Sequence, residues 1–205
     1  MMGIAVFASG SGSNFEALVN HSRKNRWADP ICLLVCDCPG AGVLKRAERL
    51  QVPILCRSPK QFADKKAYET WILDHLKAYQ VKKIVLAGYM RLIGSTLLEA
   101  YPDQIINIHP SLLPAFPGKN AIEKAFRHPV CVSGVTVHLV DEGMDTGPIL
   151  AQVPVEIERD DTLESFEQKI HQAEHRLYPE TVQKWIAGEI GPRQVHIKPE
   201  EEEKN

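Results

Sequence analysis

The sequence predicts an α/β fold in which short buried strands alternate with amphipathic helices. Three observations lead to this class. Short continuous apolar runs recur through the first half of the chain, a helical spacing of apolar residues follows each run, and two long alternating runs come only afterwards. A continuous apolar run is typical of a strand buried on both faces, whereas alternation is typical of a strand with one face covered.

The first half of the chain is expected to form a right-handed, mostly parallel sheet. The expected strands lie at residues 4–8, 30–36, 52–55 and 84–87 and in the run that begins at residue 105. The expected helices carry Phe15, Leu18 and Val19 on one face, and then cover residues 41–50, 62–79 and 96–100. Strands that alternate with helices in this way form βαβ units, which place helices on both faces of the sheet.

The pattern changes after a helix expected at residues 121–127. Alternating runs at residues 130–139 and 149–158 predict antiparallel strands that extend the sheet. A long final helix is expected at 161–187, with Asp161 and Glu164 as its capping pair. The predicted fold is therefore one Rossmann-like domain, with a mostly parallel sheet, C-terminal antiparallel strands and a long last helix.

Composition indicates an ordinary soluble protein. The chain has 205 residues, 44% of them hydrophobic and 24% charged, and a net charge of −2. That balance gives no reason to expect a nucleic-acid or membrane surface. No apolar run approaches the ~20 residues of a membrane helix. Five cysteines without a signal peptide predict free thiols in the cytoplasm.

A glycine-rich turn follows the first strand. Residues 9–14 read SGSGSN, and Ser13 with Glu16 three positions later predicts a capping box at the start of a helix. A strand, a glycine turn and a helix N-terminus together favour anion binding. The dinucleotide pattern G-x-G-x-x-G fails at Phe15, and there is no Walker lysine, so a single phosphate is favoured. The alternative is a plain βα turn that needs glycine for its backbone angles.

Two further features at the end of the second strand support different hypotheses. Asp37 stands where a nicotinamide enzyme would hold its ribose, and it is the best argument for an oxidoreductase. Cys36 and Cys38 form a C-x-C pair, which without a second pair is weak evidence for a metal. We expect no metal site.

The run IINIHPSLLP at residues 105–114 is the strongest functional candidate. Side chains alternate along a strand, so Asn107 and His109 point to the same side, and Pro110 then ends the strand. An amide that can hydrogen-bond an oxyanion, beside an imidazole that titrates near neutral pH, suits acyl transfer. The alternative is a histidine satisfied in a loop and an asparagine that caps a turn.

Two other loops have the composition of a ligand site. Residues 88–93, GYMRLI, place exposed apolar side chains around Arg91 at a strand end, which suits an aromatic ligand with an acidic tail. They could equally be core residues beside a surface charge. Residues 140–148 form an acidic loop that contains glycine and separates the two alternating strands.

Four segments together resemble one family, the folate-dependent formyltransferases. They are GSGSN at 10–14, AGYMR at 87–91, NIHPSLLP at 107–114 and DEGMDTGP at 141–148. The resemblance runs from the first strand to about Gly188. It is strongest to the members that formylate glycinamide ribonucleotide with 10-formyltetrahydrofolate in purine biosynthesis. It implies one formyltransferase domain at 1–190, with a phosphate-binding half at about 1–100, a folate and catalytic half at about 101–190, and a solvated tail at 191–205.

The resemblance also implies roles for individual residues. The implied catalytic residues are Asn107, His109 and Asp145. The implied nucleotide-binding residues are Gly12, Ser13, Asn14 and Glu174, the last of them a ribose contact. The implied folate-binding residues are Lys65, Met90, Arg91, Leu92, Ile93, Asn107, Val140, Asp141, Glu142, Gly143 and Met144. The chain departs from some relatives at His171, where they place a glutamine toward the sugar phosphate, and at Ala115, where they carry a basic residue.

The mechanism implied by the family agrees with the chemistry of these side chains. Asn107 and protonated His109 would donate hydrogen bonds to the oxyanion, and Asp145 would hold His109 in its charged form. The partners are then two small molecules, and a homodimer is possible. The rival hypotheses are a formyltetrahydrofolate deformylase, a methionyl-tRNA formyltransferase, a nicotinamide-binding oxidoreductase and a non-catalytic phosphate-binding module.

Overall fold

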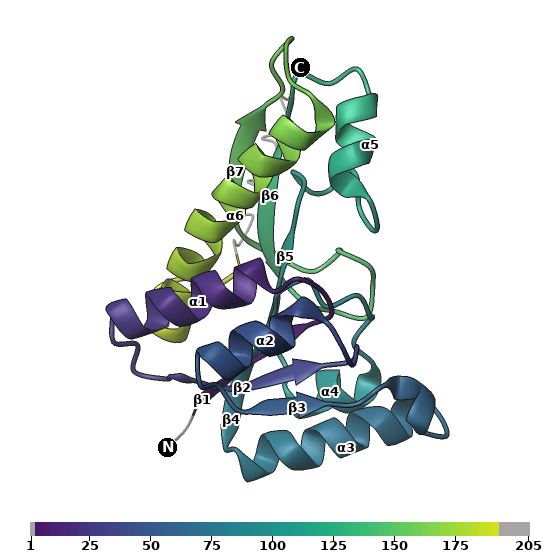
Figure 1. Cartoon of the computed structure of the whole chain (residues 1–205), viewed down its shortest axis with the longest axis vertical. Coiled ribbons are helices and arrows are strands. Elements are labelled where there is room, and N and C mark those ends of the chain that lie inside the picture. The colour runs from purple at the N-terminus through teal and green to yellow at the C-terminus, as the bar shows by residue number, and fades with distance from the viewer. Residues whose placement is uncertain (1–2, 193–205) are drawn as a thin grey trace, which may run out of the picture.

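The computed structural model describes residues 3–192 and contains one seven-stranded sheet (Figure 1). The strand order is β3-β2-β1-β4-β5-β6-β7. The strands are β1 Gly3–Ala8, β2 Ile31–Cys36, β3 Ile54–Cys56, β4 Val81–Leu86, β5 Ile105–His109, β6 Val132–Leu139 and β7 Ile149–Glu156. The first five are parallel and the last two antiparallel, so the predicted topology is confirmed.

Six α-helices cover the two faces of the sheet within the described residues. They are α1 Ser13–Lys24, α2 Gly42–Arg49, α3 Lys65–Ala78, α4 Ser95–Ala100, α5 Ala121–Arg127 and α6 Leu163–Ile186. Helices α1, α2, α5 and α6 pack on one face, and α3 and α4 pack on the other (Figure 1).

Strand β1 shows why a continuous apolar run forms the centre of such a sheet. All six of its residues are buried. Ile4 and Val6 pack against the α1 side, and Ala5 and Phe7 pack against the α3 side, because successive side chains point to opposite faces. A strand covered on both faces needs apolar residues at every position.

The order of the strands creates the site. Strand β1 lies between β2 and β4, and the chain moves away from it in opposite directions on the two sides. The loops that follow β1 and β4 therefore separate above the sheet, which is where ligands bind in open α/β folds. Ser9 N donates to Gly88 O at 3.0 Å and joins the bases of these two loops.

Helix α6 is anchored to the middle of the sheet by a buried tyrosine. The hydroxyl of Tyr178 lies 2.7 Å from Leu86 O, at the end of β4, and 3.4 Å from Ile106 O on the neighbouring strand β5. Burial raises the pKa of Tyr178 well above its ordinary value, so the hydroxyl remains a donor. This contact fixes the part of α6 that faces the strand ends.

Both predicted helix caps are wrong. Gly12 is the N-cap of α1, with φ 80°, and Ser13 is the first helical residue. Glu16 forms ion pairs with Arg46 and Arg49 of α2 instead of closing a capping box. These pairings depend on how α1 and α2 pack.

The cap of α6 lies one residue later than expected. Thr162 and Ser165 form the reciprocal capping box, and Asp161 accepts from Ser165 Oγ and pairs with Lys169. The other boundaries shift by up to three residues. Helix α3 begins three residues later than expected, at Lys65, because Asp64 caps it, and β4 begins three residues earlier, at Val81. The expected tail at 191–205 lies almost wholly outside the described residues.

The structure also bears on the cysteines and on the expectation that no helix spans a membrane. All five cysteines are free thiols in the structure. Among the helices of residues 3–192, none is long and apolar enough to cross a membrane.

Candidate active site

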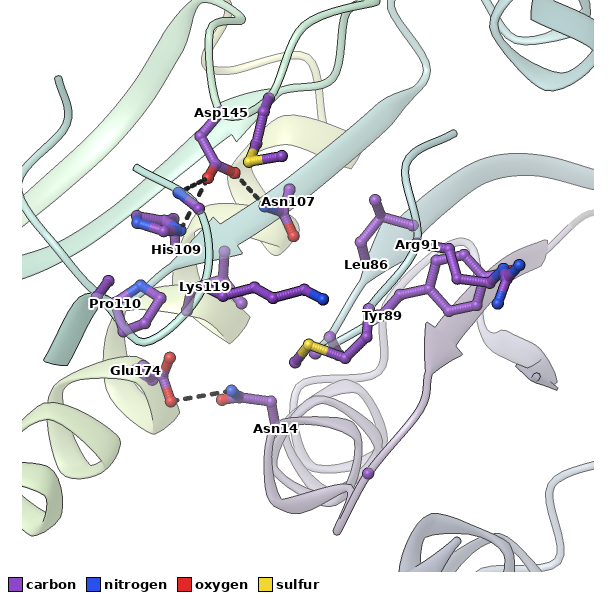
Figure 2. A pocket seen from close by; sticks show the side chains of 18 of the residues that line it. Asn14, Leu86, Tyr89, Arg91, Asn107, His109, Pro110, Lys119, Asp145 and Glu174 are labelled. Carbon is purple, nitrogen blue, oxygen red and sulfur yellow. Dashed lines mark hydrogen bonds and ion pairs between the residues drawn. The ribbon is translucent and has the colours of Figure 1, made fainter. Parts of the chain in front are cut away.

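A cavity of about 920 Å³ lies along the carboxyl ends of β1, β4 and β5 (Figure 2). Its lining comes from five parts of the chain, namely residues 10–14, 86–93, 107–110, 118–123 and 138–145, and from α6. The cavity thus brings together the four sequence segments that resemble the folate-dependent formyltransferases. Parallel strands whose carboxyl ends meet at one edge account for this convergence.

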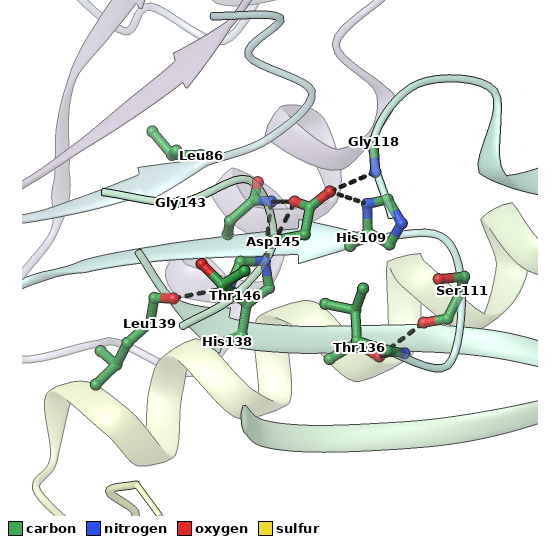
Figure 3. Close-up of polar contacts among 12 residues, drawn as sticks. Leu86, His109, Ser111, Gly118, Thr136, His138, Leu139, Gly143, Asp145 and Thr146 are labelled. Atoms are coloured by element: carbon green, nitrogen blue, oxygen red, sulfur yellow. Dashed lines mark hydrogen bonds and ion pairs between the residues drawn. The ribbon is translucent and has the colours of Figure 1, made fainter. Parts of the chain in front are cut away.

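Asp145 lies between Asn107 and His109. Its Oδ2 is 3.3 Å from His109 Nδ1, and its Oδ1 is 3.5 Å from Asn107 Nδ2 (Figures 2 and 3). The backbone N–H of Gly118 donates to Oδ2 at 2.7 Å. The side chain is 12% exposed, so the carboxylate is held largely out of water.

The backbone of the 140–147 loop is shaped to bring Asp145 to this place. Asp145 has φ 58°, an uncommon conformation for a residue with a side chain. Close approach at Gly147 makes the loop possible, because a Cβ there would lie 1.9 Å from Leu139 O. Thr146 Oγ1 also donates to Asp141 Oδ1 at 2.7 Å. The loop is therefore folded on itself where it carries the carboxylate.

His138 is a member of the site that sequence reasoning missed. It pairs with Asn107 across the antiparallel β5–β6 ladder, and its Nε2 lies 3.2 Å from Asn107 Nδ2 and 3.6 Å from Asp145 Oδ1. A proton on Nε2 would be donated to Asp145, and without that proton Nε2 accepts from Asn107. Alternation along the predicted strand at 130–139 could have shown which face of the sheet His138 lies on. The residue that it faces on the neighbouring strand depends on the strand register, which the sequence does not show.

The surroundings of Asp145 favour its charged form. The hydrogen bond with His138 contributes most, Gly118 N–H and the charge of His109 add to it, and burial opposes them. The result is a pKa for Asp145 below its ordinary 3.8. Asp145 is therefore an anion throughout the neutral pH range.

His109 is oriented differently from what the sequence suggested. Its Nδ1 faces Asp145, and its Nε2 lies 2.9 Å from Phe116 O. Both partners are oxygen atoms, so each ring nitrogen can donate to its partner when it carries a proton. Neither nitrogen of His109 points freely into the cavity. The nearest other side-chain donor at this strand end is the Asn107 amide, whose nitrogen faces Asp145 and His138.

The loop after β5 is held rigidly against the sheet. Thr136 Oγ1 donates to Ser111 O at 2.6 Å (Figure 3), and Gln152 Nε2 donates to Leu113 O at 2.9 Å. The loop then places Lys119 at the cavity, with its side chain pointing inward (Figure 2). Sequence reasoning missed Lys119, because a lysine in an irregular loop carries no periodic signal.

The glycine-rich loop forms one end of the cavity. The N-cap Gly12 has no side chain, so the first N–H groups of α1 receive no capping acceptor from it. A Cβ on Gly12 would lie 2.5 Å from Val43 Cγ2 of α2, so the close packing of α2 also requires glycine. Free N–H groups and the helix dipole make this end suitable for an anion.

Asn14 and Glu174 meet at the same end. Asn14 Nδ2 donates to Glu174 Oε2 at 3.1 Å, and His171 Nδ1 lies 2.9 Å from the same oxygen. Glu174 raises the pKa of His171 above its ordinary 6.5. Asn14 Oδ1 is buried and has no partner among the described residues, so it can accept a hydrogen bond from a ligand hydroxyl.

The opposite end of the cavity has an apolar wall. Met90, Leu92 and Met144 line the cavity and are 68%, 51% and 51% exposed, and exposed apolar surface at a cavity is typical of a ligand-binding site. Arg91 stands among them and pairs with Asp37 at 3.7 Å. A flat ligand with an acidic group would cover these side chains and meet the guanidinium.

The structure brings most of the predicted ligand residues to the cavity but not all of them. Lys65 and Glu142 are not among the lining residues, and Lys65 instead lies 3.9 Å from Glu69. Ile93 contributes to the lining yet is 6% exposed and belongs mainly to the core. Asp37 is outside the lining, with its oxygens used by Ser9 and Arg91, so it is not placed to bind a ribose.

A mostly parallel sheet with a glycine-rich helix N-terminus, and with an amide, a buried imidazole and a carboxylate close together at one edge, has the arrangement of a group-transfer enzyme. The chain belongs to the formyl transferase family, whose profile matches residues 2–182.

Relatives within the family are close in sequence and in structure. A phosphoribosylglycinamide formyltransferase from Bacillus subtilis is 54% identical over 91% of this chain and 95% of that protein. The crystal structure of the enzyme with that name from Bacillus halodurans superposes with a TM-score of 0.87 at 51% identity, over 91% and 96% of the two chains. A glycinamide ribonucleotide transformylase from Geobacillus kaustophilus gives 0.87 at 54% identity, over 90% and 98%. The family and the fold expected from the sequence are thus confirmed.

Proposed function

We propose that this protein transfers the formyl group of 10-formyltetrahydrofolate to the amine of glycinamide ribonucleotide. The products are formylglycinamide ribonucleotide and tetrahydrofolate, in purine biosynthesis. The single observation that carries the proposal is the position of Asp145, which contacts Asn107 and His109 inside a cavity with an anion-binding end and an apolar end.

The nucleotide is assigned to the end formed by α1 and α6. Its phosphate would accept hydrogen bonds from the N–H groups of Gly12, Ser13 and Asn14, where the helix dipole favours negative charge. Its ribose would lie near Glu174 and could donate to the unpaired Asn14 Oδ1. The glycine amine is then directed along the cavity toward the strand end of β5.

The folate is assigned to the opposite end. Met90, Leu92 and Met144 offer apolar surface to its rings, and Arg91 offers a cation to its glutamyl carboxylates. Val140, Asp141 and Gly143 line the same end of the cavity, so the loop from β6 would close over the pterin. Lys65 and Glu142 have weaker support, since neither lines the cavity.

The side chains at the strand end supply electrostatics and proton handling. As the new C–N bond forms, negative charge develops on the formyl oxygen. The amide N–H of Asn107, which otherwise faces Asp145 at 3.5 Å, would turn to donate to that oxygen, and the imidazole of His109 lies beside it. The attacking amine gains positive charge, which Asp145 stabilises. When the bond to the folate nitrogen breaks, the proton lost by the amine must reach that nitrogen. Because the pKa of Asp145 is lowered, it holds this proton only in passing.

One assay tests the proposal. The protein is mixed with 10-formyltetrahydrofolate, with and without glycinamide ribonucleotide, and release of tetrahydrofolate is followed by absorbance. We expect release only with the nucleotide, and formylglycinamide ribonucleotide in equal amount. Release at the same rate without nucleotide would indicate a deformylase, and absence of any release would refute the proposal.

A further inference from the structure

Asp37 is a buried carboxylate for which the proposed reaction has no use. It lies directly after β2, its side chain is 5% exposed, and it does not line the cavity. A buried carboxylate costs free energy unless hydrogen bonds or an opposite charge compensate it. Its partners therefore indicate what it does.

Both oxygens of Asp37 contact groups that lead to the apolar wall. Ser9 Oγ donates to Oδ1 at 2.6 Å, and the same Oγ accepts from the backbone N–H of Met90 at 2.9 Å. Oδ2 lies 3.7 Å from Arg91 Nη1. Asp37 thus holds two successive residues of one loop, the first through a hydroxyl relay and the second by charge.

The loop held in this way has few other restraints. Gly88 has φ 73°, and the side chains of Met90 and Arg91 are 68% and 47% exposed. Ser9 N donates to Gly88 O, and packing of Tyr89 on Phe7 fixes the base of the loop. Beyond Tyr89, the polar contacts of Met90 and Arg91 within residues 3–192 are that of Met90 N with Ser9 Oγ and that of Arg91 with Asp37.

We propose that Asp37 is a positioning residue for the cosubstrate: through Ser9 and Arg91 it holds the wall at Met90 and aims the Arg91 guanidinium at an acidic group of the ligand. The proposal rests on the function proposed above. Asp37 pairs with Nη1 of the Arg91 guanidinium, and the rest of that half-exposed group remains available to bind the ligand. Asp37 then acts on cosubstrate binding without touching substrate.

The main test is Asp37→Asn, which preserves shape and the acceptor for Ser9 but turns an NH₂ group toward Arg91. We expect KM for 10-formyltetrahydrofolate to rise roughly 5- to 30-fold, the range expected for loss of one charge-assisted contact that is partly exposed. The kcat and the KM for the nucleotide should stay within about twofold, since Asp37 contacts Ser9 and Arg91 but neither the residues of the anion site at 12–14 nor Asp145. Exposed Asp74→Asn on α3 is the matched control.

A truncated cosubstrate separates positioning from a general structural role. With 10-formyltetrahydropteroate, which lacks the glutamyl carboxylates, Asp37→Asn should raise KM much less than it does with the complete folate. In the Arg91→Gln background, Asp37→Asn should have little further effect on the KM for the complete folate. Equal losses with both cosubstrates, or full additivity with Arg91→Gln, would overturn the proposal.

Measuring ligand binding at equilibrium makes the test independent of turnover, and a second variant keeps it possible if the first does not fold. Ser9→Ala removes the relay and leaves the Asp37 charge, so it serves if Asp37→Asn does not fold. Both variants should bind pteroylglutamate more weakly than the wild type does, with unchanged nucleotide binding. If the wild type binds both ligands without formyl transfer, the proposed function fails and the Asp37 test still stands. If wild-type transfer is normal and the variants bind pteroylglutamate equally well, the Asp37 inference fails alone.

Discussion

Asp145→Asn is the substitution that tests the candidate site most directly. Asparagine has the size of aspartate but presents one oxygen and one NH₂ group. If its oxygen accepts from Gly118 N, its NH₂ group faces the amide nitrogen of Asn107, which is also a donor. If the amide is turned, the NH₂ group faces Gly118 N and His109. Either orientation loses a contact and removes the charge beside His109.

The distance to His109 sets the expected magnitude. At 3.3 Å and an effective dielectric constant of about 20, two unit charges attract by about 5 kcal/mol, which is an upper bound. A hydrogen bond to a charged group contributes about 1.5–3 kcal/mol net. With about 1.4 kcal/mol for each factor of ten, loss of the hydrogen bond should lower kcat by roughly 10- to 100-fold, and the electrostatic upper bound limits the fall to roughly 4,000-fold.

The assay is the nucleotide-dependent release of tetrahydrofolate under saturating conditions. The KM for the nucleotide should change little, because the anion site lies at the other end of the cavity. Asp161→Asn is the control, since Asp161 pairs with Lys169 outside the cavity and should leave kcat unchanged. A kcat within threefold of wild type for Asp145→Asn would refute the role given to the carboxylate.

The lowered pKa of Asp145 also predicts how stability depends on pH. A carboxyl group whose pKa is lower in the folded state stabilises the protein above its unfolded pKa, and this contribution is lost as pH falls through the folded pKa. The difference in free energy of unfolding between wild type and Asp145→Asn should therefore shrink from neutral pH toward pH 3. Denaturant unfolding at both pH values measures it, and a difference that does not depend on pH would contradict the pKa assignment.

Three further predictions concern the ligand-binding ends. Gly12→Val should raise the KM for the nucleotide far more than that for the folate, because the side chain meets Val43 and displaces the loop; equal changes would count against the anion site. An antifolate should slow amide hydrogen exchange in residues 140–146, and protection confined to residues 10–14 would contradict the folate assignment. The KM for the nucleotide should rise with pH through the raised pKa of His171, as the positive charge paired with Glu174 is lost. In His171→Gln that pH dependence should disappear, and an unchanged pH profile would exclude a phosphate contact.

The sequence by itself determined the order of the elements, the type of sheet and the position of the main functional loops. Hydrophobic periodicity and turn-forming residues are local properties, so they can be recognised in the sequence without knowledge of the fold. Pro110 after Asn107 and His109 marked a strand end, and the glycines at 10 and 12 marked a tight turn. The parallel core with two added antiparallel strands followed from the same reasoning.

Only the tertiary structure decided which side chains meet. His138 faces Asn107 because of the register between β5 and β6, and a shift of one residue would turn it to the other face. The pairing of Glu16 with α2 overrode a local capping signal. Asp37 binds Arg91 because β2 and β4 end on either side of β1. Such contacts join residues far apart in sequence, and they depend on packing that no local pattern encodes.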